Sequence, residues 1–215
     1  MHFNLTSNKS FCAVSGICGI IGVILLVISF NINPGPPPDA SIEQLSAFAQ
    51  RYSSSILLGA WLQCVGPVLI VVFAFALVKL ANAGNRLTGM MTVFGASILM
   101  TVSLMEIAMY IGALFENPQF GGLISLHFIY SIQHLYFIVA APAFFIPLGM
   151  VLIQSSILPK IFGWTGILLG FLFVVLGIAF LQVQILPPAI TALGGIQVFW
   201  WIAASISLIL RASKM

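Results

Sequence analysis

The sequence contains very little charge. Of its 215 residues, 5% are charged and 61% are hydrophobic, and the mean hydropathy is +1.18. A soluble domain carries roughly a quarter of its residues as charged ones, so the composition excludes an ordinary soluble fold. Apolar runs of about 18 residues or more, long enough to cross a bilayer, recur along the whole chain. We therefore predict one all-α, polytopic transmembrane domain covering residues 1–215.

Cysteine is also scarce, and the excess of positive charge is small. The three cysteines form no CxxC pair, and Cys12 and Cys18 are six residues apart, nearly opposite on a helix. Ordinary apolar packing is therefore favoured over a disulfide or a metal pair. The net charge of +3 comes from a few residues near helix ends, and it indicates membrane topology instead of a nucleic-acid partner.

Six membrane spans are expected, joined mostly by short connections. The connecting segments contain the Gly, Pro or Asn residues that end helices, as in "NAGNR" and "ENPQFGG". Spans joined this way are antiparallel neighbours. They are predicted at about residues 11–30, 54–79, 88–115, 123–154, 161–183 and 192–211.

The connection at 31–53 is longer than the others. Its run "PGPPP" cannot be helical and predicts a stiff, extended outer loop. Asp39 or Ser41 can then cap a short amphipathic helix that reaches residue 53. This helix either lies at the membrane surface, as a lid on the bundle, or extends the second span.

The basic residues predict the orientation of the bundle. With six spans, six of the seven Lys and Arg residues fall on one side, and only Arg51 falls on the other. Under the positive-inside rule this places both termini in the cytoplasm. The first 30 residues resemble a signal peptide, but the apolar run is long and no small-x-small cleavage site follows it, so we expect a retained helix.

Polar side chains recur inside the predicted spans at helical spacing. On a helix, positions i, i+3 and i+7 share a face. One such stripe lies on the fourth span, a second lies on the third span, and a glutamine lies on the second span one turn before Pro67. The members are His127, Tyr130 and His134; Ser103, Glu106 and Tyr110; and Gln63.

Three of these polar groups, one on each of the three spans, lie at a similar depth in the outer half of the predicted bundle. Counted from the outer ends of their spans, Glu106, His134 and Gln63 lie about 15, 16 and 14 Å deep. A carboxylate in hydrocarbon costs several kcal/mol unless it is paired, hydrated or protonated. We therefore expect Glu106 and His134 to form one hydrogen-bonded unit, with Tyr130 or Gln63 as further partners.

The same residues fit a metal or a cofactor poorly. His127 and His134 are separated by about 10.5 Å along one helix, too far to share an ion. No Ser-His-Asp set, phosphate loop or lysine within a span is present. We therefore expect no metal and no cofactor.

Three functions are compatible with this pattern. The first is binding or transport of a small lipophilic or amphipathic molecule, in a pocket lined by Gln63, Glu106, Tyr110, His127, Tyr130 and His134. The second is a membrane-embedded acid–base enzyme, an isomerase or hydrolase of a lipid-like substrate, that uses Glu106 and His134. The third is a structural or assembly protein with no ligand. We expect membrane lipids as partners, and the sequence leaves oligomerisation open.

The segment "PLGMVLIQSSILPKIFGWTGILLG", residues 147–170, resembles a bacterial family of six-span membrane proteins of unknown function. The features that carry the resemblance are Gly149, the turn Leu158-Pro159-Lys160, Gly163 and Gly170. The resemblance implies a six-helix fold in a bacterial inner membrane. It implies no activity, and therefore no catalytic residue.

Overall fold

The computed structural model describes residues 5–33, 41–115, 123–182 and 187–214 of the protein, and in these ranges every regular element is helical. Six helices are long and apolar enough to cross a membrane, which confirms the predicted all-α six-span architecture. The fourth span is built from α4, η2 and α5 in succession. The elements are α1 (Leu5–Ile32), α2 (Ile42–Leu80), α3 (Leu87–Phe115), α4 (Leu123–Leu135), η2 (Tyr136–Ala140), α5 (Ala141–Ile153), α6 (Lys160–Gln182) and α7 (Pro187–Lys214).

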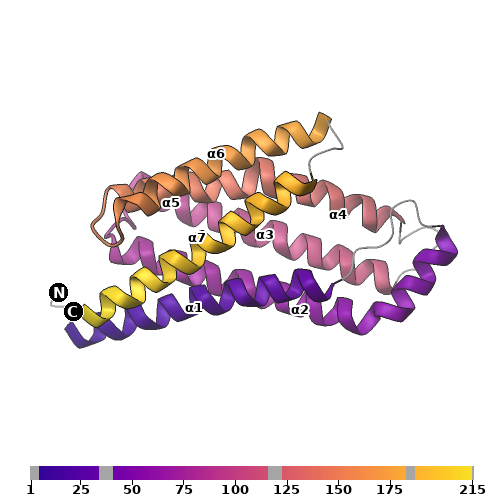
Figure 1. Ribbon diagram of the computed structural model, residues 1–215, viewed down its shortest axis with the longest axis horizontal. Helices are drawn as coiled ribbons and strands as arrows, with labels where there is room; N and C mark the ends of the chain where they lie inside the picture. Colours follow the sequence, from indigo (N-terminus) through magenta and orange to yellow (C-terminus); the bar gives the residue numbers. More distant parts are fainter. Residues whose placement is uncertain (1–4, 34–40, 116–122, 183–186, 215) are drawn as a thin grey trace.

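The helices run back and forth along the long axis of the molecule (Figure 1), and their contacts form a closed ring. Helices adjacent in the chain pack side by side from α1 to α3, and α3 packs against both α4 and α5. Next, α5 packs against α6, and α7 closes the ring by contacting both α6 and α1. The start of α1 and the end of α7 lie at the same end of the bundle, as an even number of spans requires.

Helix α2 is longer than a bilayer is thick. Its 39 residues correspond to about 58 Å, and its first turns project past the neighbouring helices and bend relative to the rest of α2 (Figure 1). Ser41 caps the helix with a capping box, in which its hydroxyl accepts from the Gln44 N–H and Gln44 Oε1 accepts from the Ser41 N–H at 2.8 Å. Residues 42–53 are therefore the extension of the second span, one of the two alternatives open from the sequence.

Two prolines shape the fourth span. Pro142 has no N–H to donate, so the hydrogen-bond ladder before it is incomplete in any helical form. Directly before it, η2 is a wide π-helical turn in which the Ala141 N–H reaches back to the Tyr136 carbonyl. Pro147 leaves the carbonyl of Ala143 without its helical donor, and α3 passes this carbonyl closely at Gly95. A Cβ on Gly95 would lie 2.1 Å from the Ala143 oxygen.

A second close approach joins α5 and α6. A Cβ added to Gly149 would lie 2.6 Å from the carbonyl oxygen of Gly163, and a Cβ on Gly163 would lie 2.7 Å from that of Gly149. These distances are too short for any larger residue. Gly149 and Gly163 therefore allow backbone contact between the helices on either side of the turn.

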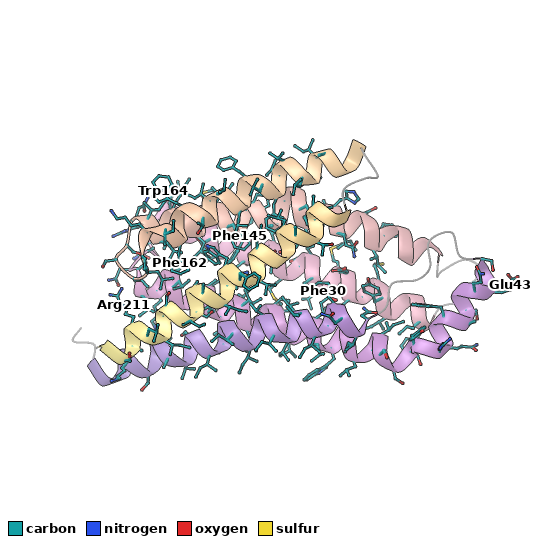
Figure 2. All side chains as sticks on the ribbon, viewed as in Figure 1. Phe30, Glu43, Phe145, Phe162, Trp164 and Arg211 are labelled. Atoms are coloured by element: carbon teal, nitrogen blue, oxygen red, sulfur yellow. The ribbon has the colours of Figure 1, made fainter. Side chains whose placement is uncertain are left out.

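The centre of the bundle is filled by aromatic rings. Phe144 stacks on Trp201 with ring centroids 5.5 Å apart, and Phe145 stacks on Phe173 at 6.0 Å. Phe73 of α2 meets Trp201 edge-on at 5.9 Å. Figure 2 shows Phe145 at this position, between the helices. Because offset and edge-to-face pairs add to the burial of the rings, this cluster fixes α2, α5, α6 and α7 relative to one another.

Two charged side chains mark the two ends of the bundle. Figure 2 shows Arg211 and Glu43 at opposite ends of the molecule. At the end that carries Arg211, its guanidinium donates to the Ser156 carbonyl, and Lys79 lies over the Phe11 ring at 5.1 Å. These contacts hold α7 against the α5–α6 turn and α2 against α1.

Candidate functional site

Glu106 lies inside the bundle. It is located on α3, nine residues before the helix ends at Phe115, or about 14 Å along the axis. Its side chain is 8% exposed. A carboxylate at this depth costs several kcal/mol unless polar groups around it replace the water it has lost. The neighbours of this side chain therefore decide whether the helix can place it there.

Two amides from two other helices donate to the Glu106 carboxylate. Gln63 Nε2 of α2 lies 2.7 Å from Oε2, and Gln133 Nε2 of α4 lies 2.9 Å from Oε1. Gln63 is 3% exposed, so this contact is shielded from solvent. Hydrogen bonds to an ionised group are about twice as strong as neutral ones. The cluster of Gln63, Glu106 and Gln133, hereafter the Glu106 cluster, joins the second, third and fourth spans.

The backbone of α2 is also adapted to this site. Pro67 cannot donate to the carbonyl four residues before it, which belongs to Gln63. Ser103 of α3 lies on the same face as Glu106, one turn earlier, and its hydroxyl donates to that carbonyl at 3.4 Å. Two residues of α3 therefore contact Gln63. Glu106 binds its side-chain amide, and Ser103 binds its backbone carbonyl.

The arrangement of hydrogen bonds defines what the cluster can bind. Both oxygens of the Glu106 carboxyl group accept a hydrogen bond. Because both amides donate through Nε2, their Oε1 atoms remain acceptors, and no described residue donates to them. The cluster therefore presents oxygen acceptors from three helices around one carboxylate.

A second polar pair links the fourth span to α7. The Tyr136 phenol oxygen lies 2.9 Å from Gln197 Oε1 and 2.6 Å from Gln197 Nε2. Tyr136 belongs to the wide turn η2, three residues after Gln133. The Tyr136–Gln197 pair is thus a polar neighbour of the Glu106 cluster.

The structure brings together some of the residues predicted from the sequence. Gln63 and Glu106 are in direct contact. Tyr110 lies one turn after Glu106 on α3 and is half-buried, as is His134 of α4. The side chains of His127 and Tyr130 lie outside the described part of the structure.

The sequence pattern did not identify Gln133 as the α4 partner of Glu106. The stripe chosen on this span follows His127, Tyr130 and His134, whereas the side chain that donates to Glu106 comes from the residue before His134. The burial of α4 in the structure explains why Gln133 reaches Glu106. The buried apolar residues Ile129 and Ile132 define the inward face of α4, and Gln133 adjoins this face one turn after Ile129.

The two amides of the cluster contribute hydrogen bonds to Glu106. Among the described residues, no three His, Cys, Asp or Glu side chains are grouped so that they could hold a metal ion. Amide groups do not titrate, so the two described donors of Glu106 cannot exchange protons with a substrate. What the cluster offers is a buried carboxyl group with further acceptor oxygens beside it.

Comparison with known proteins identifies no relative. No protein-family model, curated protein or solved structure is significantly similar to this chain. The resemblance of residues 147–170 therefore identifies no family, and what is shown is a multi-pass membrane protein with six candidate spans and a buried polar cluster at Glu106.

Proposed function

We propose that the protein binds a small amphipathic molecule at the Glu106 cluster, as a carrier or receptor for it within the membrane. The observation that carries the proposal is the buried carboxylate of Glu106, held by amides of two other helices at 2.7 and 2.9 Å. Ionisable groups inside membrane spans line the paths and sites of ions and substrates. The tail of such a molecule would lie among apolar side chains and its headgroup at the cluster.

A purely structural role would not need an acid. A third amide in place of Glu106 could link the same three helices at lower cost, because no charge would leave water. Interaction of the carboxylate with a ligand would offset the cost of removing it from water. Tyr110, His127, Tyr130 and His134 are proposed as further lining residues of the site, since they lie at its level or between it and the outer ends of the third and fourth spans.

An acid–base enzyme is the alternative for the same site. It would need a second titratable group on the reacting atoms, and His134 is the candidate for that role. The two described partners of Glu106 are amides, and this favours binding over proton transfer.

Native mass spectrometry of the detergent-purified protein tests the proposal. We expect the wild-type protein to carry a bound molecule and Glu106→Gln to lose it, because the substitution removes the charge and retains the shape. Thr101→Val is the matched control on α3, since Thr101 is exposed and its hydroxyl bonds only within its own helix, to the Ser97 carbonyl at 2.9 Å. This variant should retain the molecule.

Other outcomes of this experiment would contradict the proposal. A bound molecule retained equally by Glu106→Gln would place the site elsewhere. Unliganded wild-type protein, with a Glu106→Gln variant that loses only thermal stability, would indicate a structural cluster.

We also propose that the chain lies in a bacterial inner membrane with both termini in the cytoplasm. Basic residues at the ends of α2, α6 and α7 support this orientation. A reporter fused after residue 215 should be active on the cytoplasmic side, and one inserted at 116–122 should be active on the outer side. The reverse pattern would overturn the orientation.

A further inference from the structure

We infer that the headgroup bound at the Glu106 cluster is a protonated amine. This inference rests on the proposed function and adds the chemical class of the ligand. It follows from two features of the bundle: the surplus of acceptors at the cluster, and the distance of every Lys and Arg from it.

The acceptors outnumber the donors that the protein supplies. An ionised carboxylate offers about four lone-pair sites, and two of them accept from Gln63 and Gln133. The Oε1 atoms of these two glutamines add further acceptors, to which no described residue donates. A ligand that satisfies these open acceptors must supply N–H or O–H donors. A primary ammonium brings three, enough for one bond each to Glu106, Gln63 and Gln133.

The distribution of charge around the site also favours a cationic headgroup. The basic residues nearest to Gln63 along α2 are Arg51, about 18 Å before it, and Lys79, about 24 Å after it. No Lys or Arg of the whole chain lies within the central part of a predicted span. An anionic headgroup would therefore meet Glu106 without a lysine or arginine to balance it, whereas an ammonium would neutralise the buried carboxylate.

Three short amphipathic compounds with equal tails test the inference: hexylamine, hexanol and hexanoate. Near pH 7 the amine is protonated and the carboxylate is ionised. Binding is measured by isothermal titration to the full-length protein in lipid nanodiscs. We expect hexylamine to bind at least about tenfold more tightly than hexanol, a difference of about 1.4 kcal/mol. Hexanoate should bind most weakly of the three.

Two variants and one control make the result specific to the cluster. In Glu106→Gln the preference for the amine over the alcohol should disappear. Gln133→Met removes one Oε1 acceptor but also the Nε2 donor to Glu106, so it leaves a buried carboxylate lone pair that an ammonium can fill. It should therefore increase the preference for the amine over the alcohol, and it serves if Glu106→Gln does not fold. Thr101→Val should bind all three compounds as the wild type does.

The outcomes separate this inference from the proposed function. Hexanol or hexanoate binding as tightly as hexylamine, with a dependence on Glu106, would overturn the amine headgroup and leave the binding function standing. An amine preference that survives in Glu106→Gln would also overturn the inference. Absence of binding by all three compounds, together with unliganded wild-type protein in native mass spectrometry, would overturn both.

Discussion

Replacing Gly95 with valine is expected to prevent α3 from packing against α5, and therefore to reduce strongly the amount of folded protein. A Cβ at this position would lie 2.1 Å from the Ala143 oxygen, 2.5 Å from its carbonyl carbon and 2.8 Å from the Phe144 Cα. All three are backbone atoms, so no side-chain rotation relieves the overlap. Pro147 makes this close approach useful, because it leaves the Ala143 carbonyl without its helical donor.

A graded series measures the effect. Overpacking typically costs 1–3 kcal/mol, so Gly95→Ala should lower the free energy of unfolding by about that amount and Gly95→Val by more. Unfolding in mixed micelles with an increasing share of denaturing detergent gives the values. Gly194→Ala in α7 is the control, because nothing lies within 4 Å of its Cβ position. If Gly95→Val unfolds at the same share of denaturing detergent as the wild type, α3 and α5 do not meet as described.

Removing one amide from the Glu106 cluster is expected to cost more than removing the amide and the acid together. Gln63→Leu leaves one carboxylate oxygen buried without the donor now 2.7 Å away. Breaking a buried charged contact from one side costs about 3 kcal/mol or more, whereas replacing both partners with apolar groups can be nearly neutral. The double variant Gln63→Leu/Glu106→Leu should therefore be more stable than Gln63→Leu alone.

The free energies of unfolding of the two single variants, the double variant and the wild type form a double-mutant cycle for this pair. The expected coupling has a fixed sign, since the second substitution rescues the first. Thr101→Val should change stability by less than about 0.5 kcal/mol, as surface substitutions usually do. Additive losses in the double variant would mean that Gln63 and Glu106 do not interact.

Much of the architecture could be predicted because hydrocarbon restricts what a chain can do. Each span must satisfy its own backbone, so a long apolar run between helix-ending residues has one solution. The long connection after α1 was less determined. The capping box at Ser41 indicates where a helix starts, but nothing in residues 42–53 states whether it continues into the next span. The structure makes one helix of both.

The tryptophans show a second limit of the sequence. Trp61 and Trp201 both lie within apolar spans, yet Trp61 is 60% exposed and Trp201 is 1% exposed. In a soluble protein the polar residues of a helix mark its outer face. In a membrane both faces are apolar, so the face that meets lipid cannot be separated from the face that meets the core.

Gln133 was not predicted as a partner of Glu106 for a related reason. A wide turn adds one residue to the helix, and each residue corresponds to about 100° of rotation. The turn η2 therefore rotates α4 relative to α5, and in an uninterrupted α-helix His134 would occupy the angular position that Gln133 has. Pro142 signals a break in the ladder, but it does not state whether the chain responds with a kink or with an extra residue.

The measurement that tests the central claim most directly is an experimental structure of the protein with its co-purified or added ligand. The account predicts a headgroup atom within hydrogen-bond distance of a Glu106 carboxylate oxygen, roughly 2.7–3.2 Å, with Gln63 and Gln133 still beside that carboxylate. A ligand bound only at the lipid-facing surface or at the basic end of the bundle, with Glu106 contacted by protein groups alone, would contradict it.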